Sequence, residues 1–197
     1  MNIDKRIGAA VLAGAATMFV WGGLSHMVLL KGAGFSRLPN EDRVLAELKQ
    51  SIPEDGLYFF PGIDLRGSPS KEEQSSWEAR FHAGPTGMIV FHPSGGTPIS
   101  AKKLGIQAAS HLLASAIVTW VLACLSTAVF WRRVVVAGAL GAFSCLSVST
   151  IYWSWYGYPD AFFAAQCIDM IVGWSLAGAA VAAVLRMRGA AAVFARG

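Results

Sequence analysis

Four long apolar runs constrain this chain more than any other feature of its sequence. They extend over residues 7–30, 105–131, 134–156 and 160–185. A helix rises about 1.5 Å per residue and the core of a bilayer is about 30 Å thick, so about 20 residues suffice for one crossing. Each run therefore predicts a transmembrane helix, and the chain as a whole predicts an all-α membrane protein with four crossings.

One polar segment separates the first run from the other three. Within residues 31–104 the sequence predicts a helix ending near Ser51, a strand at 57–60, a second helix opened by the capping-box spacing at 70–73, and a strand at 88–91. The two strands are similar in length, so they are expected to pair. The predicted organisation is transmembrane helix 1 at 1–30, an α/β cap domain at 31–104, transmembrane helices 2 to 4 at 105–186 and a tail at 187–197.

The basic residues predict the orientation of the chain. Residues 31–104 carry as many acidic as basic side chains, whereas the bases outside this segment lie at one set of helix ends: Lys5, Arg6, Arg132, Arg133, Arg186, Arg188 and Arg196. The positive-inside rule then places both termini and the 187–197 tail in the cytoplasm, with the cap on the other side as an extracytoplasmic domain. The basic residues that produce the net charge of +4 lie where the positive-inside rule expects them, so this charge does not indicate a nucleic-acid partner.

The N-terminal run allows two interpretations, whereas the cysteines indicate one. A basic start followed by an apolar run also suits a signal peptide, but the run continues well past a possible cleavage site at 13–16, which favours a retained helix. Cys124, Cys145 and Cys167 all lie in apolar runs and are expected to act as small hydrophobic side chains. The cap contains no cysteine and needs no disulfide, so we expect a bacterial-type inner membrane with a periplasmic or extracellular cap.

A small set of polar residues inside the runs is the candidate site. Asp169 lies about ten residues inside the fourth run, where a carboxyl group is costly unless it is paired, protonated or hydrated. His26, His111 and Gln166 fall at similar depths when counted from the same membrane face, so one shared layer is geometrically possible. The candidate ligand-binding residues are therefore His26, His111, Gln166 and Asp169.

Several roles suit these residues. His26, His111 and Asp169 are candidate metal ligands, the two imidazoles are candidate haem ligands, and all three suit a proton relay. In a purely structural interpretation, both histidines are interfacial and Asp169 bonds to a serine of a neighbouring helix. No motif identifies a cofactor or a catalytic residue, and neither a metal-binding spacing nor a P-loop is present.

The sequence predicts a protein that acts by binding. The leading hypothesis is a non-enzymatic accessory or scaffold subunit of a larger membrane complex, in contact with the lipid bilayer and with other membrane subunits or with itself. Small residues recur every fourth position at Ala10 and Gly14 and again at Gly173 and Ala177, where neighbouring helices can approach closely. The alternative is a membrane enzyme or a metal-, haem- or ligand-binding protein with its site under the cap. A transporter is a weaker hypothesis, because no inverted repeat is visible.

Overall fold

The computed structural model describes residues 3–64, 66–125 and 129–186. Among these residues, four helical segments are long and apolar enough to cross a membrane: Lys5–Leu29, Ala101–Cys124, Phe130–Tyr156 and Asp160–Arg186. A small two-stranded sheet lies between the first and second segments in the sequence. The predicted fold class is confirmed, and the protein is a multi-pass membrane protein whose spans contact lipid.

Two of the four spans contain a π-helical turn. The first span is α1 (Ile3–Leu24) followed by η1 (Ser25–Leu29), and the second is α4 (Ala101–Cys124). The third comprises α5 (Phe130–Ser144), η2 (Cys145–Ser149) and α6 (Thr150–Tyr156), and the fourth is α7 (Asp160–Arg186). We call the half of each span that adjoins the 31–104 segment or the 157–159 turn the loop side.

The second span differs from the predicted run at both ends. It begins at Ala101 instead of Gly105 and ends at Cys124 instead of Trp131. The Arg132-Arg133 pair lies in the first turn of α5 and not in a turn between helices. Hydrophobicity alone misplaced this boundary, because the sequence stays apolar where the backbone becomes extended at Leu125.

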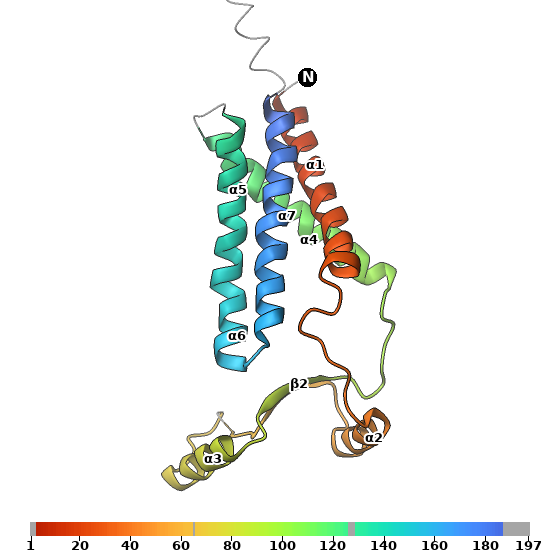
Figure 1. Ribbon diagram of the computed structural model, residues 1–197, viewed down its shortest axis with the longest axis vertical. Helices are drawn as coiled ribbons and strands as arrows, with labels where there is room; N and C mark the ends of the chain where they lie inside the picture. Colours follow the sequence, from red (N-terminus) through yellow and green to blue (C-terminus); the bar gives the residue numbers. More distant parts are fainter. Residues whose placement is uncertain (1–2, 65, 126–128, 187–197) are drawn as a thin grey trace, which may run out of the picture. The chain divides into compact units, whose positions relative to one another are not determined.

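Close helix packing organises the membrane part. Figure 1 shows α7 between α5 and α1, with α4 crossing obliquely behind them, and α7 makes its most extensive contacts with α5 and α1. A Cβ atom added at Gly141 of α5 would lie 2.3 Å from the backbone oxygen of Met170 in α7. Only small residues permit such an approach. The predicted small-residue faces of α1 and α7 are packed at Ala10 and Ala177, both fully buried.

The cap is a separate compact unit of residues 36–98, compared with the predicted 31–104. It contains α2 (Glu41–Ser51), β1 (Gly56–Phe60), α3 (Lys71–Ala83) and β2 (Gly87–Phe91). The strands pair, as expected, and they are antiparallel, with Leu57 opposite Val90. The capping box at Ser70 and Glu73 is also confirmed, since each side chain bonds to the backbone N–H of the other residue. None of the described residues of this unit is buried.

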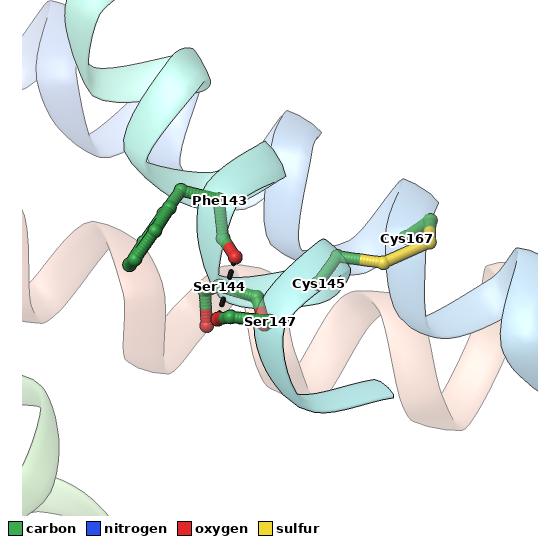
Figure 2. The surroundings of a disulfide bond; sticks show 5 residues. All are labelled: Phe143, Ser144, Cys145, Ser147 and Cys167. Carbon is green, nitrogen blue, oxygen red and sulfur yellow. Dashed lines mark hydrogen bonds between the residues drawn. A yellow bond between two sulfur atoms is a disulfide. The ribbon is translucent and has the colours of Figure 1, made fainter. Parts of the chain in front are cut away.

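The expectation that all three cysteines act as small hydrophobic side chains is wrong for two of them. Cys145 of η2 and Cys167 of α7 form a disulfide, with their Cα atoms 5.3 Å apart (Figure 2). Cys124 has an exposed free thiol. In the same π-helical turn the hydroxyl of Ser147 donates to the carbonyl of Phe143 at 2.7 Å. The third and fourth spans form a helical hairpin, so residues two to three turns from its connecting segment on either side come together. The proximity of Cys145 and Cys167 cannot be predicted from either apolar run alone, because it depends on how the two helices pair.

Candidate functional site

Asp169 carries a carboxyl group that is buried on the loop side of the spans. It lies in the third turn of α7 and is only 3% exposed. Its Oδ1 atom accepts a hydrogen bond from the hydroxyl of Ser25, a fully buried residue at the start of η1. This contact between neighbouring helices is the one that the purely structural interpretation expects. It satisfies one oxygen of a carboxyl group that would be costly to leave unpaired inside a membrane.

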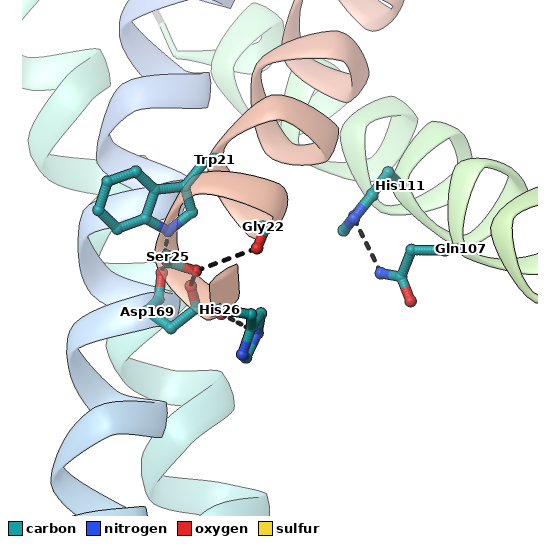
Figure 3. Close-up of polar contacts among 7 residues, drawn as sticks. All are labelled: Trp21, Gly22, Ser25, His26, Gln107, His111 and Asp169. Atoms are coloured by element: carbon teal, nitrogen blue, oxygen red, sulfur yellow. Dashed lines mark hydrogen bonds and ion pairs between the residues drawn. The ribbon is translucent and has the colours of Figure 1, made fainter. Parts of the chain in front are cut away.

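His26 contacts the second oxygen of the same carboxyl group. Its Nε2 atom lies 3.5 Å from Oδ2 of Asp169, and its side chain is 58% exposed. One helical turn earlier, the indole N–H of Trp21 donates to the backbone oxygen of Asp169 at 3.1 Å. Three side chains of the first span therefore converge on one residue of α7 (Figure 3). Two of them lie in a π-helical segment, a feature that frequently marks functional sites.

His111 does not join this cluster. It lies on α4, where one of its ring nitrogens is 2.8 Å from the amide nitrogen of Gln107, and its ring meets that of Phe19 edge-on at 6.4 Å. Figure 3 shows the two α4 side chains apart from those around Asp169. Among the described residues, no other polar group bonds to either of them. The structure therefore divides the predicted polar layer into two parts, one at the α1–α7 contact and one on α4.

Gln166 lies one turn before Asp169 and faces two cavities. The first, of about 350 Å³, is also lined by His26 and by residues of the segment that follows η1. The second, of about 230 Å³, is lined on the hairpin side by Ser149, Tyr152 and Tyr158. His26 and Gln166 therefore line the same cavity. Asp169 contacts His26 but does not line the cavity.

The side chains of His26 and Asp169 determine what this site can bind. Within the described ranges, no group of three or more His, Cys, Asp or Glu side chains is close enough to hold a metal ion. His26 and Asp169 form a pair in which the carboxyl group orients the imidazole and favours a proton on Nε2. In the neutral imidazole the other ring nitrogen keeps its lone pair and can accept a hydrogen bond from a bound molecule.

Sequence reasoning did not identify Trp21 or Ser25, although they complete the contacts of Asp169. Serine and tryptophan are common in membrane helices, so neither residue stands out alone. Their spacing was informative, because Trp21 and Ser25 are four residues apart and therefore lie on one helix face. No family model matches this sequence, and no similar protein was found among curated proteins or solved structures.

Proposed function

We propose that the protein is a non-enzymatic accessory or scaffold subunit of a larger membrane complex. The observation that carries this proposal is the lack of any buried residue among the described residues of the cap, 36–98. A two-stranded sheet is marginal in water without a layer packed against it, and a unit of this size has little core of its own. A partner surface would supply the missing layer.

The sheet of the cap presents an apolar pair for such a partner. Leu57 and Val90 are directly paired across the strands and are 65% and 66% exposed, respectively. Further along the same face, Phe59 stacks on Phe81 of α3, with ring centroids 6.2 Å apart. Helix α3 therefore covers one end of this face, while the end formed by Leu57 and Val90 is open. Paired apolar side chains at an uncovered position are typical of a binding surface.

The second span adds a polar contact surface within the membrane. Gln107 is exposed and His111 is half-buried, and the hydrogen bond between them leaves further donors and acceptors unused. Such groups are costly in hydrocarbon, and polar residues of this kind commonly bond to a neighbouring transmembrane helix. A helix of a partner subunit against α4 would satisfy them. This favours a partner that is itself a membrane protein.

The proposed setting is a bacterial-type inner membrane with both termini in the cytoplasm and the cap outside. The guanidinium group of Arg6 donates to the carbonyls of Val184 and Leu185 at 3.5 and 3.4 Å, so the N-terminal end of α1 and the C-terminal end of α7 lie at the same face. The Cys145–Cys167 disulfide lies on the loop side, which suits an oxidising compartment there. Topology reporters fused at Gly95 and after residue 197 should report opposite compartments, and a common compartment would contradict this orientation.

The accessory role is tested by charge substitution in the sheet. Leu57→Glu should release copurifying membrane proteins, because a carboxylate in an apolar contact loses its hydration without gaining a partner. Ser94→Glu is the matched control, since it introduces the same charge at an exposed position of the cap outside the strands. Both variants are extracted from the native membrane in mild detergent and their copurifying proteins are quantified by mass spectrometry.

The outcome depends on the difference between these two variants. Loss of the same protein from Leu57→Glu, but not from Ser94→Glu, supports a partner at the sheet. The Cys145–Cys167 disulfide should form in both variants, which checks that the third and fourth spans still pair. If the two variants retain the same proteins in the same amounts, the sheet is not the contact and the proposal loses its main support.

A further inference from the structure

The cavity shared by His26 and Gln166 has the composition of a small-molecule site. Its volume of about 350 Å³ lies in the range of ligand pockets in proteins. It lies entirely within the membrane part of the chain, between the segment after η1 and the first turns of α7. Two polar side chains reach it among mostly apolar ones, and this balance is typical of a site that orients a ligand.

The apolar walls favour a flat ring. Phe35 and Phe162 line the cavity with their rings edge-on to each other, 5.6 Å apart at an angle of 78°. Leu30 and Ala165 complete the apolar lining. Aromatic pairs prefer offset or edge-to-face contact, so an added ring can pack against either phenylalanine.

The polar walls favour a ligand with a hydroxyl group. His26 has one ring nitrogen 3.5 Å from Asp169, which leaves the lone pair of the other nitrogen to accept a hydrogen bond. The amide of Gln166 has no hydrogen-bond partner among the described residues and can both donate and accept. A ring that carries a hydroxyl group and a second oxygen satisfies both side chains.

Two other classes of membrane ligand fit less well. A phosphate head group is held by lysine or arginine, and neither residue lines the cavity. An ammonium head group is held by a free carboxylate or by a cage of several aromatic faces. Both oxygens of Asp169 already have partners, and the lining supplies only the rings of Phe35 and Phe162 for a cage. A neutral head group is therefore favoured over a charged one.

We infer that this cavity binds the head group of a membrane-soluble quinol, with the ring against Phe35 and Phe162. A ring hydroxyl donates to Nδ1 of His26, and the amide of Gln166 donates to the second ring oxygen. The cavity lies at the loop-side ends of the first and fourth spans. This inference does not depend on the accessory role, because the site lies within a single chain.

The test is binding of a defined quinol to the full chain in lipid nanodiscs. The probe is a radiolabelled 1,4-benzoquinol with a ten-carbon tail, kept under anaerobic conditions. Gln166→Leu should weaken binding about 10-fold, the effect of one lost hydrogen bond of ordinary strength. Gln107→Leu is the matched control, since it makes the same substitution on α4 at a residue outside the cavity, and it should bind as the wild type does.

A second comparison needs no variant and remains decisive if Gln166→Leu fails to fold. The dimethyl ether of the probe keeps the ring and the tail but has no hydroxyl donor, so it should bind the wild-type chain at least 10-fold more weakly. Equal binding of quinol and ether would overturn the inference. Equal binding by Gln166→Leu and the wild type would also overturn it, and so would displacement of the quinol by an anionic phospholipid.

Discussion

A double-mutant cycle between Ser25 and Asp169 is the sharpest test of the polar contact between the first and fourth spans. The cycle comprises Ser25→Ala, Asp169→Ala and the double variant. Interhelical hydrogen bonds inside membranes contribute about 0.6 kcal/mol on average and at most about 1.7 kcal/mol. Both partners here are buried and the acceptor belongs to a carboxyl group. We therefore expect a coupling energy near the upper end, about 1.5 kcal/mol.

The assay is reversible unfolding in mixed micelles, followed by helical circular dichroism as the fraction of denaturing detergent rises. Each single variant should lower the free energy of unfolding, and the double variant should lower it by less than the sum of the two. Asp169→Asn should recover most of the loss, because the amide keeps an oxygen that can accept from Ser25. The recovery separates loss of the hydrogen bond from loss of volume.

The cycle has an internal control in Trp21. Its indole N–H donates to the backbone oxygen of Asp169, which every substitution at that position retains. A cycle of Trp21→Phe with Asp169→Ala should therefore give a coupling energy within about 0.5 kcal/mol of zero. Coupling near zero for the Ser25 cycle, or equal coupling in the two cycles, would refute the account of Asp169 as a residue held by its side-chain contacts.

Three further predictions follow from close approaches and cross-links. Gly34→Ala should destabilise the membrane part by more than Gly32→Ala in the same unfolding assay. Both glycines have positive φ, so an alanine at either position costs about 1–2 kcal/mol of backbone strain. Only at Gly34 would the added Cβ atom also collide with α7. Gly141→Ala should cost about 1–3 kcal/mol, because the added methyl group would meet the backbone of α7 at 2.3 Å. Reduction of the Cys145–Cys167 disulfide should cost about 3 kcal/mol, as expected for the loop it closes. Non-reducing peptide mapping should recover the two cysteines in one cross-linked peptide pair.

Each of these predictions has a clear contrary result. Equal destabilisation by Gly32→Ala and Gly34→Ala would mean that the segment after η1 does not pack against α7. Gly105→Ala is the control for the α5 variant because nothing lies within 4 Å of a Cβ atom there, and equal effects would contradict close packing of α5 on α7. Alkylation of Cys145 and Cys167 without prior reduction, in protein from the native membrane, would contradict the disulfide.

The membrane architecture was predictable because span length and apolar composition are local properties of the sequence. The capping box of α3 and the two strands were predictable for the same reason, since each depends on residues within a few positions of one another. The end of α4 at Cys124 was not predictable, because the neighbouring sequence remains apolar where the helix ends. Local patterns thus identify elements more reliably than they locate the ends of elements.

The site was predictable only in part because its contacts join different spans. Depth along each helix placed His26 and Asp169 in one layer, and these two residues do meet. Depth also placed His111 there, but depth does not specify the direction of a side chain around its helix, and this residue bonds along α4 instead. The Cys145–Cys167 bond was missed for a related reason, since the proximity of these residues depends on how two helices pair.

The mass and protein content of the particle extracted from its native membrane in mild detergent test the central claim most directly. The account predicts a stoichiometric complex in which this chain is accompanied by at least one other membrane protein. Recovery of the chain alone, or only with copies of itself, would contradict the proposed role as an accessory subunit of a larger complex.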